Sequence, residues 1–187
     1  MSYQYLILLA VLALRLWELF YSWRRLSVDR REGRAQTLPE AVYPVIVALH
    51  AGWLAACLGE VLLREPRFQA WLVLPMLCLW GLSLALRFWV IASLGELWNV
   101  RLVERTEQPV VTAGPYAYIR HPNYLVVIVE IAAVPLMFGA YWTALIASLA
   151  NGLVLWRRIA REEAYLFQFP AYREAFAHKK RLLPGLF

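Results

Sequence analysis

The residues that could do chemistry gather in two polar segments of an otherwise apolar chain. The first is Gly114–Tyr124, GPYAYIRHPNY, and the second is Arg158–Glu163, RIAREE. Polar and charged side chains beside a membrane-spanning run usually mark a functional site, because structure alone does not require them there. We therefore interpret the two segments as the two halves of one cofactor site at a membrane surface.

The first segment has the pattern of a helix start that holds an anion. Proline favours the first turn of a helix and pushes the residue before it out of helical conformation, so His121 should lie just before a helix that begins at Pro122. Asn123 and Tyr124 would then fall in its first turn. Backbone N–H groups at such a start, with Arg120 and His121 beside them, can hold a carboxylate or a phosphate. The simpler alternative is an interfacial anchor, although an anchor does not require His-Pro-Asn-Tyr in that order.

The second segment places opposite charges on one helix face. Arg158 and Glu162 are four residues apart, and side chains with that spacing are neighbours on a helix. A salt bridge worth about 0.2–0.5 kcal/mol is the plain interpretation. The alternative is that an acid here meets a cationic ligand, because Glu162 and Glu163 stand at the beginning of a basic tail.

The chain around these segments is too apolar for a soluble domain. It has 187 residues, of which 61% are hydrophobic and 17% are charged. A transmembrane helix needs about 20 mainly apolar residues, and the apolar runs here are too long for barrel strands. We therefore predict a single all-α integral membrane domain, residues 1–187, with about five transmembrane helices. The predicted spans are residues 3–23, 41–63, 69–93, 122–138 and 140–156.

Proline and glycine indicate the breaks in the second half. The apolar run from 122 to 156 is too long for one span, and Pro135 and Gly139 predict a tight hairpin of two short helices. The tail that follows should be helical to about Phe167 and broken at Pro170.

The distribution of basic residues predicts the orientation. Fifteen of the nineteen lysines and arginines fall in three segments, which are a polar loop over 24–40, residues 94–122 and the tail 157–187. Because basic residues concentrate on the cytoplasmic side, we expect these segments in the cytoplasm and the N-terminus outside.

Charges inside the spans are expected to pair, since an unpaired charge in a bilayer is costly. Arg87 should pair with Glu130 across the third and fourth helices, and Arg15 with Glu18 along the first. His50 is expected to hydrogen-bond to a neighbouring helix, and a role in the site is the weaker alternative.

The cysteines and the N-terminus predict no further chemistry. Cys57 and Cys78 lie inside apolar runs and should be small core residues, and no metal site is expected, because nothing has metal-ligand spacing. No cleavable signal peptide is expected either, since the first apolar run lacks a basic segment before it.

Together the two polar segments resemble the isoprenylcysteine carboxyl methyltransferase family, integral membrane enzymes that use S-adenosylmethionine. The resemblance runs from about Gln108 to Pro184 and is carried by GPYAYIRHPNY, RIAREEAYL and the terminal FPAYREAF and RLLPGLF stretches. The RHPxY element is shared with related membrane methyltransferases and reductases, and the downstream Arg and Glu-Glu make the resemblance more specific. The N-terminal half is similar only as hydrophobic helices.

The resemblance implies roles for individual residues. Arg158 would be the catalytic residue that faces the substrate, and Glu162 would meet the amino group of the cofactor. Gln108 stands where the eukaryotic enzymes have a different polar residue. The residues expected to line the cofactor pocket are Gln108, Pro109, Val110, Val111, Tyr116, His121, Pro122, Asn123, Tyr124 and Glu162.

The implied reaction moves a methyl group from the sulfonium of S-adenosylmethionine to an oxygen of a lipophilic substrate. An acceptor that is already anionic needs alignment and a desolvated pocket more than a strong base. Some compact relatives O-methylate alkylpyrones and alkylresorcinols, so a prenylcysteine carboxylate and an acidic enol or phenol are both candidate acceptors. The acceptor would enter from the bilayer, and the compact chain fits a bacterial inner membrane.

Two alternatives stay open. An NADPH-dependent membrane reductase of the sterol type also carries an RHPNY-like element, but those enzymes typically continue with Gly-Glu, whereas Leu125 follows Tyr124 here. A non-catalytic helical membrane scaffold would keep the intramembrane ion pairs and bind no cofactor. The sequence contains no GxGxxG loop, which argues against a soluble Rossmann-type methyltransferase.

Overall fold

Long helices make up most of the chain. The computed structural model describes residues 3–64, 69–106 and 109–183. Its long helices are α1 (Tyr3–Arg31), α2 (Val42–Arg64), α3 (Ala70–Leu94), α4 (Pro122–Met137) and α5 (Tyr141–Leu166). The short elements are β1 (Ala35–Thr37), the 3-10 turn η1 (Gly95–Leu97), β2 (Val103–Arg105), the 3-10 turn η2 (Gly114–Ala117) and α6 (Pro170–Phe176).

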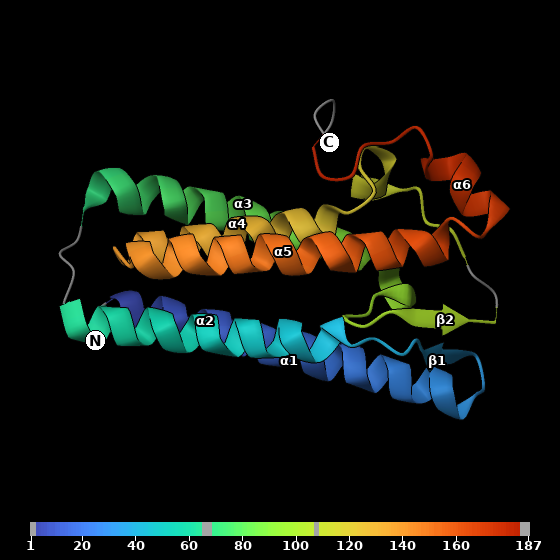
Figure 1. Ribbon diagram of the computed structural model, residues 1–187, viewed down its shortest axis with the longest axis horizontal. Coiled ribbons are helices and arrows are strands. Elements are labelled where there is room, and N and C mark those ends of the chain that lie inside the picture. The colour runs from blue at the N-terminus through green and yellow to red at the C-terminus, as the bar shows by residue number, and fades with distance from the viewer. Residues whose placement is uncertain (1–2, 65–68, 107–108, 184–187) are drawn as a thin grey trace.

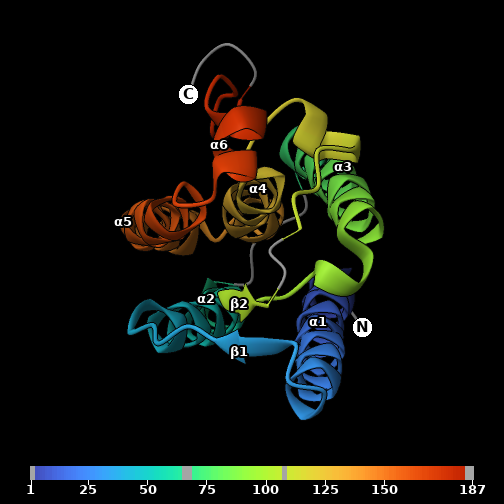
Figure 2. The ribbon, with the colours of Figure 1, turned by 90° about the vertical axis from the view of Figure 1, so that its right-hand side faces the viewer.

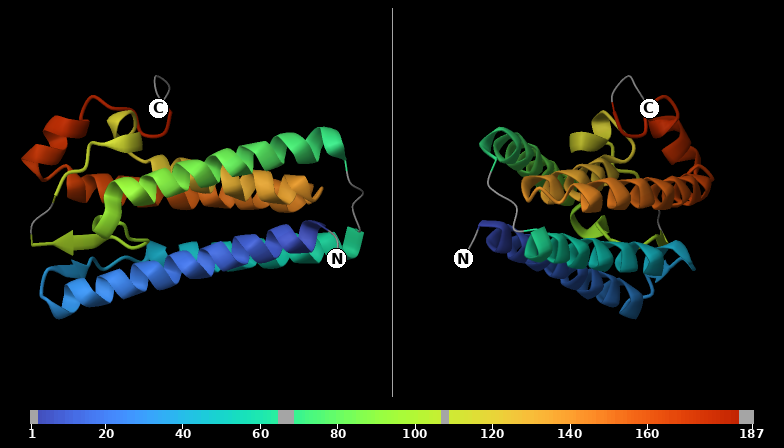
Figure 3. Two further views of the ribbon diagram at one scale, coloured as in Figure 1. Left: turned by 180° about the vertical axis from the view of Figure 1, so that it is seen from behind. Right: turned by 60° about the vertical axis from the view of Figure 1, so that its left-hand side comes forward.

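The long helices form two layers. Viewed along the bundle, α3, α4 and α5 lie in one layer and α1 and α2 in the other (Figure 2). The short elements β1, β2, η2 and α6 all lie at one end of the bundle, opposite the N-terminus (Figures 1 and 3). Polar segments far apart in the sequence therefore meet at a single end, which we call the polar end.

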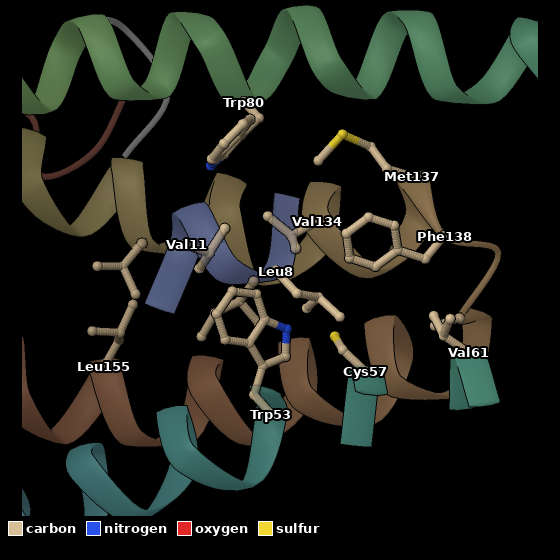
Figure 4. Close-up of a cluster of buried hydrophobic side chains, with 13 residues drawn as sticks. Leu8, Val11, Trp53, Cys57, Val61, Trp80, Val134, Met137, Phe138 and Leu155 are labelled. Carbon is tan, nitrogen blue, oxygen red and sulfur yellow. The ribbon is translucent and has the colours of Figure 1, made fainter. Parts of the chain in front are cut away.

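The core lies between the layers and is apolar. Leu8 and Val11 from α1 meet Trp53 and Cys57 from α2 and Val134 from α4 (Figure 4). The outward faces are also apolar, with large exposed side chains such as Leu63, Trp71 and Trp156. Apolar side chains on both faces are what a helix bundle in a bilayer requires. Cys78 is exposed on such an outward face, so the prediction that it is a core residue is wrong, whereas Cys57 is buried.

Within the described residues, three helices are long and apolar enough to cross a membrane: α1, α2 and α3 with the turn that follows it. Helix α4 is apolar but has 16 residues, somewhat fewer than the usual span. The all-α prediction is confirmed, and the fourth and fifth spans stay predictions.

The first helix extends beyond its predicted end. The sequence suggested a polar loop over 24–40, but α1 continues to Arg31 and β1 then pairs antiparallel with β2. The reason is a polar anchor in the last turns of α1. Asp29 accepts hydrogen bonds from Arg34 at 3.0 Å and from Arg105 of β2 at 2.7 Å, so the helix is held against the ribbon outside the apolar region.

The predicted hairpin near Gly139 is confirmed, with one correction. Helix α4 ends at Met137, Gly139 takes a positive φ of 68°, and α5 starts at Tyr141. Helix α5 is not short, because it runs for 26 residues and carries the second polar segment without a break. As predicted, the chain then breaks before Pro170, where α6 begins.

Candidate active site

A cavity of about 290 Å³ lies among the five long helices toward the polar end, and both predicted segments line it. This volume is near the lower end of the range for small-molecule pockets. Nine of the eleven residues predicted for the site line the cavity: Pro109, Val110, Val111, Tyr116, His121, Asn123, Tyr124, Arg158 and Glu162. Pro122 is buried at the start of α4 and is not among the lining residues, and Gln108 lies outside the described residues.

The helix start at Pro122 forms as predicted, but two of its neighbouring N–H groups are already used. His121 is the N-cap of α4, with φ −126° and ψ 59°. The backbone N–H groups of Arg120 and His121 donate to the carbonyls of Lys180 and Arg181, each at 2.9 Å. The C-terminal tail runs alongside and occupies these two N–H groups, whereas anion binding by the N–H groups in the first turn of α4 stays a prediction.

Glu163 joins the first segment to the tail. Its carboxylate accepts hydrogen bonds from Arg120 at 3.0 Å and from Arg181 at 2.6 Å, and His121 Nε2 lies 3.1 Å from it. Burial by itself would raise the pKa of Glu163, but the hydrogen bonds from His121 and Arg181 outweigh it and lower the pKa to about 2. Glu163 is therefore a structural anion that fixes the wall of the cavity.

The two charges that helix spacing could pair, Arg158 and Glu162, have other partners. The guanidinium of Arg158 donates to the Glu40 carboxylate, to the Tyr124 hydroxyl at 3.1 Å and to the Val100 carbonyl at 3.3 Å. Glu162 instead accepts a hydrogen bond from the hydroxyl of Tyr124. Helix spacing would allow Arg158 to pair with Glu162, but Arg158 pairs with the buried Glu40 carboxylate instead.

Tyr124 connects these two groups. Its hydroxyl accepts a hydrogen bond from Arg158 and donates one to Glu162, so one phenol sets the distance between the cation and the anion. The side chain of Glu162 is 22% exposed, whereas the Arg158 side chain is 4% exposed. The cavity thus presents an accessible anion beside a deeply buried cation.

A ring of four buried charges borders the cavity, and Arg15, Glu18 and Arg87 line it. Arg87 contacts Glu130 at 2.5 Å and Glu18 at 2.8 Å, and Arg15 contacts Glu18 at 2.9 Å and Glu130 at 2.8 Å. Both predicted pairs, Arg87 with Glu130 and Arg15 with Glu18, are confirmed. Arg87 also lies 3.5 Å from the amide oxygen of Asn123, so the ring touches the first segment.

His50 lines the same cavity but does not bond as expected. Its Nδ1 lies 2.9 Å from the carbonyl of Ile46, one turn earlier on α2. The predicted bond to a neighbouring helix is wrong, because the local carbonyl is within reach of the ring.

Sequence reasoning missed Glu40 and the anchoring role of Glu163. Glu40 stands next to Pro39 in a linker and belongs to no motif, so no local signal identified it. Glu163 was visible as half of an acidic pair, and the adjacent basic tail was a usable signal for its partner Arg181.

A comparison of the sequence with known protein families gives a match that includes most of the residues of this cavity. Residues 72–168, from α3 through α5, match the isoprenylcysteine carboxyl methyltransferase (ICMT) family. This chain belongs to that family. The family match includes the Gly114–Tyr124 segment, Arg158 and Glu162, all of which the structure brings to the cavity.

Individual relatives cover different parts of this ICMT-family chain. The uncharacterized protein YpbQ of Bacillus subtilis is 32% identical over 130 residues, which are 70% of this chain and 77% of that protein. An uncharacterized protein of Haemophilus influenzae is 34% identical over 83 residues, 44% of this chain and 48% of the relative. Protein-S-isoprenylcysteine O-methyltransferase of Schizosaccharomyces pombe is 33% identical over 79 residues, 40% of this chain and 31% of that enzyme.

Membership of the ICMT family implies a membrane methyltransferase, and enzymes of this family use S-adenosylmethionine. The long apolar helices α1, α2 and α3 fit an integral membrane protein. The predicted resemblance is therefore confirmed at the level of the family.

Proposed function

We propose that this protein transfers a methyl group from S-adenosylmethionine to an oxygen of a lipophilic acceptor. The observation that carries the proposal is the placement of Arg158 and Glu162. One turn apart on α5, they line the same cavity as His121, Asn123 and Tyr124 at the start of α4.

The chemistry of the cavity wall fits the cofactor. Glu162 supplies a partly exposed carboxylate for the cofactor's amino group, and Tyr124 holds that carboxylate in place. Val110 and Val111 supply apolar wall for the adenosine, and burial raises the pKa of Tyr116 beside them, so its phenol stays neutral. When bound, S-adenosylmethionine supplies an electrophilic methyl group on a positively charged sulfur.

Arg158 orients the acceptor. Its guanidinium is fixed by Tyr124, Val100 and Glu40, so its remaining N–H groups have a defined direction toward an oxygen in the cavity. For an anionic acceptor, the oxygen–carbon bond forms as the sulfur–methyl bond breaks, and no proton moves. Alignment in a water-poor cavity is then the main contribution of the protein.

The acceptor class is a carboxylate, as in prenylcysteine, or an acidic enol or phenol, as in alkylpyrones. We expect the lipid part to enter from the bilayer and the cofactor to enter from the cytoplasm. We also place the protein in a bacterial inner membrane with the N-terminus outside, because the polar end carries the basic segments.

Ligand binding to detergent-purified protein tests the proposal. S-adenosylhomocysteine should bind at micromolar concentration, and Glu162→Ala should weaken that binding by roughly tenfold or more, since it removes a charged hydrogen bond. Glu174→Ala is the matched control, because Glu174 is an exposed acid on α6. Methyl transfer to lipid carboxylates and enols would then be screened with radiolabelled cofactor.

Other binding results would favour the alternatives. NADPH binding without S-adenosylhomocysteine binding would support the membrane reductase. Binding of neither, by a protein that is folded and monodisperse, would support the non-catalytic scaffold.

A further inference from the structure

Most arginines that line the cavity are already neutralised by a carboxylate. Arg15 and Arg87 belong to the charge ring, and Arg105 pairs with Asp29 at 2.7 Å. Arg120 pairs with Glu163 at 3.0 Å, and Arg158 pairs with Glu40, whose side chain is fully buried. These five cations therefore supply hydrogen bonds to a ligand but little net positive charge.

Arg101 differs from them. It lines the cavity, and within the described residues 3–64, 69–106 and 109–183 no carboxylate pairs with it. Its guanidinium lies over the ring of Tyr43, 4.7 Å from the centroid, and its buried Nε has no hydrogen-bond partner among those residues. A buried donor without a partner is costly, so this cation is set up to receive an acceptor atom that the protein itself does not provide.

The bound cofactor creates a need for such a cation. S-adenosylmethionine carries a carboxylate, and the backbone N–H groups of Arg120 and His121, just before α4, donate to carbonyls of the tail and are not free to bind it. An ionised acceptor would bring a second oxygen anion, and Arg158 already shares its charge with Glu40. Arginine suits either role, because its planar fork matches a carboxylate and stays charged when partly buried.

We propose that Arg101 binds the oxygen anion of a ligand in the cavity, either the carboxylate of the cofactor or the ionised oxygen of the lipid acceptor. This inference rests on the proposed function, because it deepens the description of the same cavity. The ring of Tyr43 supports the guanidinium by a cation–π contact, and the ligand anion completes its hydrogen bonds.

The test compares charged and uncharged ligands on Arg101→Gln. The two probes that carry a carboxylate, called the anionic probes for that group, are S-adenosylhomocysteine and palmitic acid. Their counterparts without a charged group are methylthioadenosine and hexadecanol. We expect about tenfold or greater loss of affinity for one anionic probe and no loss for its counterpart. Loss confined to S-adenosylhomocysteine identifies the cofactor carboxylate, and loss confined to palmitic acid identifies the acceptor.

Two further variants keep the test decisive. Arg161→Gln is the matched control, because Arg161 is an exposed arginine that is not part of the cavity wall. Arg101→Lys keeps the charge without the planar fork and should lose several-fold in affinity for the same anionic probe. If Arg101→Gln does not fold, the affinities of Arg101→Lys show whether Arg101 binds the ligand anion.

The proposal is overturned if Arg101 variants bind both anionic probes like the wild type, or lose charged and uncharged ligands equally. Its failure is separable from that of the proposed function. Wild-type binding of S-adenosylhomocysteine that survives Arg101→Gln, with palmitic acid binding also unchanged, removes the role of Arg101 and leaves the methyltransferase intact.

Discussion

Arg87 of α3 and Glu130 of α4 meet at 2.5 Å inside the bundle, with side chains only 2% and 5% exposed. The same two residues contact Glu18 and Arg15 of α1, so the ring joins the two helix layers. Intramembrane charges persist where partners and function require them. Here three members of the ring line the cavity, and Arg87 contacts Asn123, one of the predicted site residues.

Arg87→Ala should destabilise the protein strongly. Removing one partner of a buried ion pair leaves an uncompensated charge, which costs about 3–5 kcal/mol. The melting temperature in detergent should therefore fall, and affinity for S-adenosylhomocysteine should fall with it. Arg25→Ala is the matched control, because the Arg25–Glu96 pair is exposed and worth at most about 1 kcal/mol. Wild-type stability and binding in Arg87→Ala would contradict a role for the ring in either.

The C-terminal tail should detach at acidic pH, as Glu163 becomes protonated. The pKa of Glu163 falls from 4.5 to about 2 in the folded protein, so its stabilising effect is fully present above pH 4.5 and is lost as the pH falls toward 2. Protection of the tail against hydrogen exchange should decrease over that interval.

Glu163→Gln should show reduced tail protection already at neutral pH, because the charge that holds Arg181 is absent. Glu174→Gln, at an exposed acid on α6, should behave like the wild type. Equal tail protection in all three proteins at pH 7 and at pH 3 would argue against Glu163 as the anchor.

Gly114→Ala should disturb the packing of the first segment against α3. Gly114 has a φ of 60°, and an added Cβ would lie 2.1 Å from Ser93 Oγ and 3.0 Å from Trp89 Nε1. The backbone conformation alone costs an L-residue about 1–2 kcal/mol, and the contact with α3 adds to it. A lower melting temperature and weaker cofactor binding are expected.

The matched control for this change is Gly152→Ala. Gly152 lies within α5 and a Cβ there would meet nothing within 4 Å, so alanine should be neutral or stabilise by about 0.5–1 kcal/mol. The explanation would be wrong if both glycine variants changed the melting temperature alike.

The sequence by itself determined the all-α membrane character, the helix start at Pro122 and the break at Gly139. These features depend on local chemistry, namely the length of apolar runs and the restricted backbone of proline and glycine. It also predicted the Arg87–Glu130 pair, since a charge in an apolar span has few available partners. The nine site residues found at the cavity could be predicted for a different reason, which is that their segments resemble a known family.

Only the tertiary structure decided which partner each charge takes. Arg158 pairs with Glu40 and not with Glu162, because the linker before α2 packs against that face of α5. Glu163 holds the tail through Arg181, and the tail carbonyls take the N–H groups of Arg120 and His121. Helical spacing fixes which side chains are neighbours on one helix. The ion pairs that form depend on which distant segments bring buried charges to that face, and that is a property of the packed chain.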